Sequence, residues 1–235
     1  MAESLPMIGC MLLTRNRPDF LRRAIASYRA QTYPLHRRRL LILDSGDSAP
    51  LALAGLLNTY AETRIVTTHL KLPIGALRNM ACEYATECDV ISHMDDDDHY
   101  APTYLESQVS RLLKSGKQLV GFHSALFYRP ADGKWFKFTG APQYSMGATF
   151  VYYRSWWAKH PFPHAKFEDR PFVDQAALAH QLDSADAGDL FYATIHPGNT
   201  MPKLVTDSNW RETGDSKGMF PAAFAIDAAP VVSAA

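Results

Sequence analysis

The first half of the chain alternates short apolar runs with segments in which apolar residues recur every three to four positions. The apolar runs have the length and composition of strands that are buried on both faces of a parallel sheet. They cover residues 7–13, 40–43, 64–70 and 89–94. The periodic segments predict helices over residues 18–28, 52–61, 76–86 and 102–114. These strand–helix units predict an α/β fold with a Rossmann-like, mostly parallel sheet flanked by helices, in which ligands bind at the carboxyl ends of the strands.

The second half of the chain has a different pattern, with strand-like segments at hairpin spacing around Asp132-Gly133. The predicted strands cover residues 119–128, 135–138, 148–153 and 190–195, and a helix is predicted over 172–182. Residues 196–218 are rich in Gly, Pro, Asn, Asp and Ser and predict a mobile loop. We therefore predict one domain over residues 1–220, made of a ligand-binding half (1–115) and a smaller mixed or antiparallel half (116–220), followed by an Ala/Pro-rich tail (221–235).

Composition excludes several classes of protein. The 235 residues include 24 basic and 24 acidic side chains, so no global field favours nucleic acid or an anionic membrane. Three cysteines are too few for a disulfide framework and indicate buried thiols in a reducing compartment. No apolar stretch reaches the length of a membrane span, and the start of the sequence lacks the pattern of a signal peptide. We expect a cytoplasmic protein and leave contact with a membrane surface open.

Four consecutive aspartates, Asp95 to Asp98, directly follow the apolar run at 89–94. Carboxylates two positions apart in an extended segment point the same way, so Asp95 and Asp97 could share one face. Four carboxylates at the end of a buried strand repel one another, and a hard divalent cation such as Mg²⁺ or Mn²⁺ would relieve that repulsion. The alternative is a solvated acidic turn that precedes the next helix.

The chain resembles the inverting family 2 glycosyltransferases, which have the GT-A fold. An ordered series of segments carries the resemblance: Pro6–Leu21, Ala26–Pro34, Leu41–Gly46, Ile74–Ala81 and Asp95–Asp98. The sequence departs from the family pattern at Ser45, where a second acid is usual. In the second half the resemblance is weaker and is carried by Phe167–Val173 and Ile195–Thr200.

The resemblance implies a nucleotide-sugar site in the first half and an acceptor site in the second. Asp44 would accept a hydrogen bond from the imide N–H of uracil, and Arg78 would contact the diphosphate or the acidic cluster. The residues expected to bind the donor are Thr14, Arg15, Asp44, Arg78, Asp95 and Asp96. The expected ligands of a Mn²⁺ or Mg²⁺ ion are Asp95, Asp97 and His196, and the ion would act as a Lewis acid on the departing diphosphate.

Asp169 is the expected general base, with Glu168 as the alternative. Inverting displacement needs a carboxylate on the acceptor side that takes the hydroxyl proton as the new bond forms. An acidic pair at this place could also serve only to complement the dipole at the start of the next helix. The expected activity is metal-dependent, inverting transfer of a sugar from a nucleotide-sugar donor, with UDP as the expected nucleotide. The acceptor is left open between glycan, lipid, protein, small molecule and modified nucleic acid.

Two other functions compete with this hypothesis. A nucleotidyltransferase would have a glycine- and lysine-rich phosphate loop after the first strand, whereas residues 14–18 contain no glycine. A catalytically inactive nucleotide-sugar-binding subunit would keep the fold without the chemistry, and the presence of Asp95, Asp97 and Asp169 together argues against it.

Overall fold

The computed structural model describes residues 5–47, 62–68, 70–199 and 203–214. The strands are β1 (Ile8–Thr14), β2 (Arg38–Asp44), β3 (Thr63–Thr67), β4 (Val90–His93), β5 (His99–Tyr100), β6 (Leu119–Arg129), β7 (Lys134–Thr139), β8 (Val151–Tyr153), β9 (Leu182–Asp186), β10 (Phe191–Thr194) and β11 (Trp210–Thr213). The α-helices are α1 (Pro18–Arg29), α3 (Ile74–Tyr84), α4 (Tyr104–Ser115), α5 (Arg154–Lys159) and α6 (Asp169–Leu178). Two short 3₁₀ turns are η1 (Leu35–Arg37) and η2 (Gly147–Thr149).

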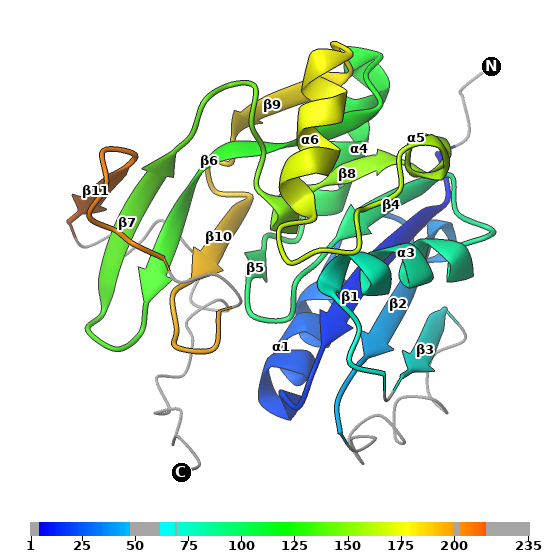
Figure 1. Cartoon of the computed structure of the whole chain (residues 1–235), viewed down its shortest axis with the longest axis horizontal. Coiled ribbons are helices and arrows are strands. Elements are labelled where there is room, and N and C mark those ends of the chain that lie inside the picture. Colours follow the sequence, from blue (N-terminus) through cyan, green and yellow to red (C-terminus); the bar gives the residue numbers. More distant parts are fainter. Residues whose placement is uncertain (1–4, 48–61, 69, 200–202, 215–235) are drawn as a thin grey trace.

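The strands form one mixed sheet, in which the order β11-β7-β6-β8-β4-β1-β2-β3 runs from one edge to the other (Figure 1). In its parallel half, β1 pairs with β2 and β4, and β2 pairs with β3. The register sets Thr14 beside Asp44 and Met11 beside His93. The carboxyl ends of β1, β2 and β4 therefore meet at one edge of the sheet, where ligands of open α/β sheets bind.

The long strand β6 organises the other half of the sheet. Its first residues pair with β8 and β9, and its later residues pair with β7 and β10. Strand β10 runs parallel to β6 and pairs on its other side with the short β5, which directly follows the acidic run. This pairing brings Thr194, at the end of β10, to Asp98, whose Oδ1 accepts a hydrogen bond from the Thr194 backbone N–H at 3.1 Å.

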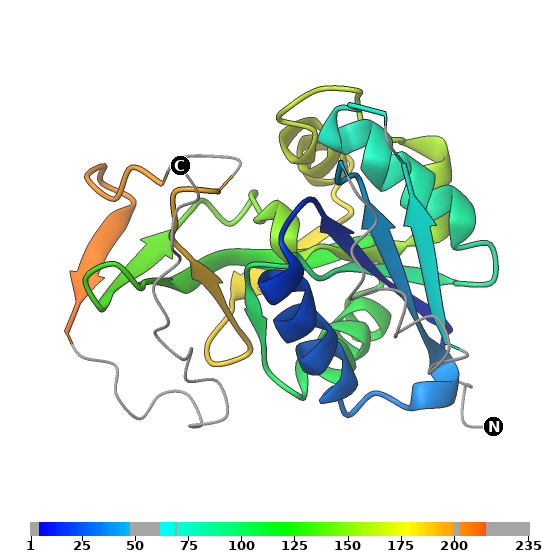
Figure 2. The same ribbon diagram turned by 90° about the horizontal axis from the view of Figure 1, so that it is seen from below.

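Two helical layers cover the two faces of the sheet (Figure 2). On one face, α1 and α4 pack against Ile8, Cys10 and Leu12 of β1. On the other face, α3, α5 and α6 pack in the cluster that includes Met11 of the same strand. Since alternate side chains of a strand point to opposite faces, the continuous apolar run of β1 is required for burial on both sides.

The predicted fold class is confirmed, and several element boundaries differ from the prediction. The third predicted strand ends at Thr67, and α6 ends at Leu178 instead of continuing to Leu182. Helix α5 and strands β5 and β9 form where no such element was predicted. Strand β11 forms inside the segment predicted as a loop, because it pairs with β7. The helix predicted over 52–61 lies outside the described residues.

The described part of the chain contains no helix that combines the length and apolar composition of a membrane span. The three cysteines, Cys10, Cys82 and Cys88, are buried free thiols, as the composition predicted.

Candidate active site

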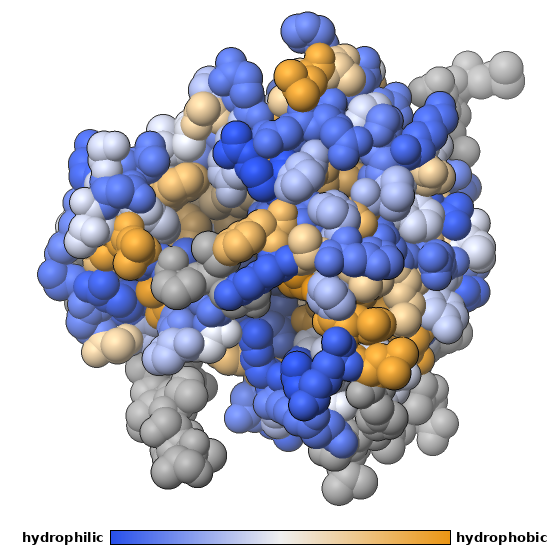
Figure 3. Space-filling model, viewed as in Figure 1, coloured by the Kyte–Doolittle hydropathy of each residue, from blue (hydrophilic) through white to orange (hydrophobic). Residues whose placement is uncertain are grey.

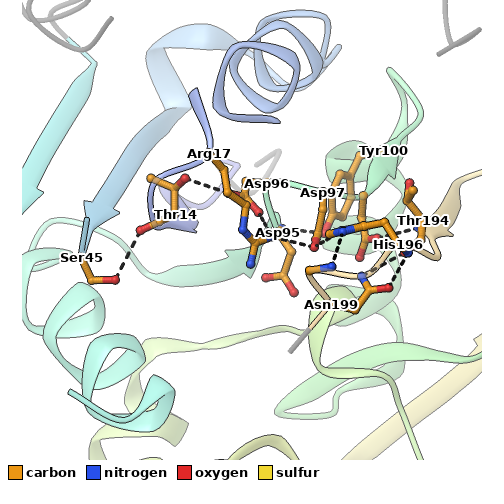
Figure 4. A network of polar contacts seen from close by, with 12 residues as sticks. Thr14, Arg17, Ser45, Asp95, Asp96, Asp97, Tyr100, Thr194, His196 and Asn199 are labelled. Carbon is orange, nitrogen blue, oxygen red and sulfur yellow. Dashed lines mark hydrogen bonds and ion pairs between the residues drawn. The ribbon is translucent and has the colours of Figure 1, made fainter. Parts of the chain in front are cut away.

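The acidic run Asp95–Asp98 begins one residue after the end of β4 and lies at the edge where β1, β2 and β10 also end (Figure 4). Its start is fixed by Tyr100, whose hydroxyl accepts a hydrogen bond from the Asp95 N–H at 2.8 Å and donates to the Ala148 carbonyl at 2.9 Å. The four side chains have different surroundings. Asp96 is 5% exposed, whereas 28% of the Asp95 side chain is exposed.

Asp96 is turned toward the end of β1. Its Oδ2 accepts a hydrogen bond from Thr14 Oγ1 at 2.7 Å, and its Oδ1 accepts one from Arg17 Nη1 at 3.1 Å. Burial raises the pKa of Asp96 to about 7, and the charge of Arg17 offsets part of that rise. Thr14 and Asp96, both expected on the donor side, are thus bonded to each other.

Asp97 is held by two donors at the same oxygen. Arg17 Nη1 lies 2.9 Å from its Oδ2, and His196 Nε2 lies 3.0 Å from the same atom. Burial alone would raise the pKa of Asp97, but the hydrogen bond from His196 and the charge of Arg17 outweigh it and lower that pKa. Asp97 is therefore a carboxylate whose negative charge is balanced by the Arg17 guanidinium.

Sequence reasoning missed Arg17 as a site residue. This residue directly precedes α1, and its guanidinium bridges Asp96 and Asp97. A signal was present, because a run of four carboxylates requires nearby cations and Arg17 lies only three residues after the end of β1. We assigned that role to Arg78 alone.

Arg78, on the first turns of α3, is buried among acidic partners. Its Nε donates to Glu168 Oε1 at 2.7 Å, and its Nη2 lies 3.7 Å from Asp95 Oδ1. Burial alone would lower the pKa of Arg78, but the charges of Asp95 and Glu168 outweigh it and raise that pKa. The guanidinium also lies 2.8 Å from Nδ1 of the buried His93, whose pKa is lowered by burial and by the Arg78 charge. His93 was also missed, since its place inside β4 made it look like a core residue.

The start of α3 approaches another loop so closely that only glycine fits at residue 75. A Cβ on Gly75 would lie 1.9 Å from the Pro163 carbonyl oxygen. The same approach brings Arg78 to Glu168, because residues 162–168 run from that contact to the start of α6. The glycine in the Ile74–Ala81 segment therefore positions the buried ion pair.

Glu168 and Asp169 are neighbours in sequence but have different environments. Glu168 is 3% exposed and is held by Arg78. Asp169 is half-buried at the first position of α6, where its Oδ1 accepts a hydrogen bond from the Arg170 N–H at 2.9 Å. A Cβ on Gly147 would lie 2.9 Å from Asp169 Oδ2, so this glycine leaves room for the Asp169 carboxylate.

Asp44 ends β2 and is fully buried. Its Oδ1 accepts a hydrogen bond from the Gly46 N–H at 2.8 Å, whereas its Oδ2 has no hydrogen-bond partner among the described residues. Arg15 lies at the surface near this turn, 3.6 Å from Asp47. Arg15 lines the acidic cavity, whereas Asp44 lies behind its wall, next to the lining residue Ser45.

The His196 ring is placed as a hydrogen-bond donor to Asp97. Its Nδ1 accepts from the Gly198 N–H at 3.1 Å, so the proton of the neutral ring resides on Nε2, which faces Asp97. An imidazole binds a metal ion through a deprotonated nitrogen. For His196 to become a metal ligand through Nε2, its contact with Gly198 would have to change.

The donor set of the predicted metal site fits a hard divalent cation by its chemistry, because carboxylate oxygens are the ligands that such ions prefer. The spatial arrangement of these ligands fits an ion less well than their chemistry does. Among the described residues, no three His, Cys, Asp or Glu side chains are gathered closely enough to hold an ion. Asp95 and Asp97 line the same cavity, and Oδ2 of Asp97 is already hydrogen-bonded to Arg17 and His196.

Two adjoining cavities meet at Asp169. The acidic cavity, of about 380 Å³, contains Asp95–Asp98, Arg17 and Arg78 in its walls. The aromatic cavity, of about 1120 Å³, lies between α6 and the β7–β11 edge of the sheet and is lined by Phe127, Phe138 and Trp210 among others. The two cavities share a wall formed by Phe127, Tyr144, Met146, Phe167, Asp169 and Lys203.

Residues 10–168 match the model of the family described as "Glycosyl transferase family 2". A search of curated proteins finds no match to this chain.

Two solved structures share the fold at 16% sequence identity. TarS (residues 1–349) of S. aureus in complex with UDP-GlcNAc aligns with a TM-score of 0.66 over 82% of this chain and 60% of that chain. Mannosyltransferase PcManGT of Pyrobaculum calidifontis in complex with GDP-Man and Mn²⁺ aligns with a TM-score of 0.65 over 86% of this chain and 59% of that chain. The chain thus spans about three fifths of the length of these two structures.

Proposed function

Because the chain belongs to glycosyl transferase family 2, we propose that it transfers a sugar from a nucleotide-sugar donor to an acceptor hydroxyl, with inversion at the anomeric carbon and with Mn²⁺ or Mg²⁺ as cofactor. In this reaction the acceptor oxygen bonds to the anomeric carbon, the bond from that carbon to the diphosphate oxygen breaks, and the hydroxyl proton passes to Asp169.

The position of Asp169 carries this proposal. Its carboxylate lies on the wall between the acidic cavity and the aromatic cavity, whereas the adjacent Glu168 is held by Arg78. A donor in the acidic cavity and an acceptor in the aromatic cavity would meet beside Asp169. A general base has to stand within hydrogen-bond reach of the proton it takes. Asp169 lines both cavities whereas Glu168 lines only the acidic one, which supports Asp169 as the base.

The charges around the acidic cavity support a role for a divalent cation. The acidic side chains in its walls are Asp95, Asp96, Asp97, Asp98, Glu168 and Asp169. The basic ones are Arg15, Arg17, Arg78, Lys166 and Lys203. Burial raises the pKa of Asp96 and of Asp98, so the ionised acids and the bases leave at most a small positive excess. A diphosphate would therefore still bring uncompensated negative charge. Asp95 and Asp97 would hold the ion, and His196 would be a further ligand once its contact with the Gly198 N–H changes. The ion would supply Lewis-acid stabilisation of the departing diphosphate.

The unpaired oxygen of Asp44 supports a choice between nucleotides. Its buried Oδ2 lacks a donor among the described residues. Uracil and guanine each carry a ring N–H that would satisfy this oxygen, whereas cytosine and adenine lack one. We propose UDP as the nucleotide, and GDP is the alternative that the same chemistry allows.

The test has two stages. Thermal stabilisation by UDP- and GDP-sugars is first measured with and without Mn²⁺, and donor turnover is then followed for the sugars that bind. Wild-type protein should turn over its donor only with a divalent ion, and Asp97→Asn should lose both turnover and the metal-dependent part of nucleotide affinity.

Full activity in excess chelator would contradict the metal assignment, and binding without any turnover would favour the inactive binding subunit. NMR of the product tests inversion directly, since a retained anomer would contradict it.

A further inference from the structure

The aromatic cavity is larger than sugar transfer alone requires. Its volume of about 1120 Å³ exceeds the 300–1,000 Å³ of typical small-molecule pockets, so one sugar ring beside Asp169 would leave much of it empty. The cavity extends away from Asp169 along α6 on one side and toward β7 and β11 on the other. An acceptor that fills it must therefore have a second part beyond the reacting sugar.

Exposed apolar side chains gather at this cavity. Phe167, Leu178 and Leu204 line it with 52%, 82% and 71% of their surface exposed. Figure 3 shows a hollow between the left-hand lobe, which holds β7 and β11, and the part that holds α6, with apolar side chains inside it and on part of its rim and hydrophilic side chains on the rest of the rim. Exposing large apolar groups to water is unfavourable, and a cluster of them at a cavity marks a place that binds an apolar partner.

The interior of the cavity has an aromatic wall. The Trp210 ring centroid lies 4.7 Å from that of Phe127 and 5.0 Å from that of Phe138. All three rings line the cavity. Their packing against one another fixes them before any ligand arrives, so binding of an apolar group here would cost little side-chain entropy.

Several charged side chains of this cavity already have partners. Arg170 Nε donates to both oxygens of Asp174 at 2.8 Å, and Asp207 Oδ1 accepts from the Asn209 N–H at 2.9 Å. A long oligosaccharide would need many free hydrogen-bonding groups along its path. The lining also carries Gln143, His180 and Lys203, but its aromatic and aliphatic side chains offer surface to a group without hydroxyls. Asp169 lies where this cavity meets the acidic cavity.

We propose that the acceptor is a glycoside with an apolar aglycone, and that the aglycone binds in the aromatic cavity while the sugar hydroxyl faces Asp169. The role of the hydroxyl rests on the proposed function; the binding of the aglycone rests on the cavity itself. Phe167, Leu178 and Leu204 would cover the aglycone at the rim, and Trp210 would contact it inside.

The experiment compares matched pairs of methyl and hexyl glycosides of glucose, galactose, mannose and N-acetylglucosamine. Their dissociation constants are measured by tryptophan fluorescence without donor, since Trp210 lies in the cavity. For at least one sugar, the hexyl member should bind at least about tenfold more tightly, which corresponds to removing about two methylene groups from water. Equal dissociation constants within every pair would overturn the proposal.

Matched variants separate binding in the cavity from nonspecific adsorption. In Leu178→Ser/Leu204→Ser the preference for the hexyl glycoside should fall toward one. The control, Leu35→Ser/Leu113→Ser, removes two exposed leucines that do not line either cavity and should keep the preference. Loss of the preference in both double variants, or in neither, would contradict the assigned location.

Donor turnover by the wild-type protein distinguishes failure of this inference from failure of the proposed function. A protein that prefers hexyl glycosides but consumes no UDP- or GDP-sugar would contradict the transfer activity and support the aglycone site. A protein that transfers to methyl and hexyl glycosides with the same KM would support the transfer activity and overturn the aglycone site.

Discussion

Arg78 and Glu168 form an ion pair that is almost closed to water. Arg78 Nε lies 2.7 Å from Glu168 Oε1, and 4% of each side chain is exposed. The pair joins the start of α3 to the residue before α6. Arg78 thus binds Glu168, whereas the neighbouring Asp169 remains on the wall between the two cavities.

Breaking this ion pair should destabilise the protein. Glu168→Gln would leave the buried Arg78 guanidinium without its nearest carboxylate, at a cost of about 3 kcal/mol in the free energy of unfolding. The control is Asp174→Asn, which breaks the exposed Arg170–Asp174 pair and should cost less than about 1 kcal/mol. Urea unfolding of both variants measures the difference, and equal stabilities would show that the Arg78–Glu168 pair has no special role.

Arg17 should compete with the metal ion for Asp97. In Arg17→Gln the acidic run loses its resident cation, so Mn²⁺ affinity without nucleotide should rise about tenfold because a positive charge no longer repels the ion. The control Arg22→Gln alters an exposed arginine of α1, the helix that follows Arg17, and should leave Mn²⁺ affinity unchanged. Electron paramagnetic resonance counts free Mn²⁺ in each titration. Weaker Mn²⁺ binding by Arg17→Gln would mean that Arg17 instead arranges the carboxylates for the ion.

Asp44 should select nucleotides by their ring N–H. Asp44→Asn replaces the carboxylate that would accept this hydrogen bond, so UDP and GDP should bind about tenfold more weakly, the expected loss for a hydrogen bond to a charged group. Binding of CDP and ADP should be unaffected. Calorimetric titration of all four nucleotides provides the test, and an equal loss for all four would indicate a general structural effect of the substitution.

Gly147 should control the position of Asp169. A Cβ at residue 147 would lie 2.8 Å from the Asp169 Cβ and 2.9 Å from its Oδ2, so Gly147→Ala must displace that side chain. A displacement of about 1 Å is expected to lower the transfer rate about 10²-fold. Gly214→Ala, where no atom lies within 4 Å of the added carbon, is the matched control. Equal transfer rates in the two variants would show that Asp169 does not depend on this space.

The sequence predicted those elements whose pattern is local. Strands β1, β2 and β4 carry continuous apolar runs because both of their faces are buried, and α1 and α4 carry apolar residues at helical spacing. Strand β9 reads Leu-Asp-Ser-Ala-Asp and has no such pattern, since its pairing with β6 defines it. Nothing in the sequence indicated the early end of α6. A left-handed residue after a helix is usually glycine, but here His180 takes that conformation (φ 56°).

The candidate site was predictable as a set of residues but not as a network. The acidic run, Arg78 and His196 could be named from the sequence. The strands that precede the site residues could also be expected to end at one edge of the sheet. The bridge from Arg17 to Asp96 and Asp97 depends on the rotation of individual side chains after β4. The choice between Glu168 and Asp169 depends on which one Arg78 reaches, and that contact spans 90 residues of chain.

The most direct test of the proposed function is to measure nucleotide affinity and transfer rate on the same Asp169→Asn protein. The substitution is nearly isosteric and removes the negative charge of the carboxylate together with its capacity to take a proton. Nucleotide affinity should stay within about twofold of wild type, and transfer should fall about 10²–10⁴-fold, the usual contribution of a general base. Transfer at the wild-type rate by Asp169→Asn would contradict the assignment of the base and, with it, the proposed geometry of the reaction.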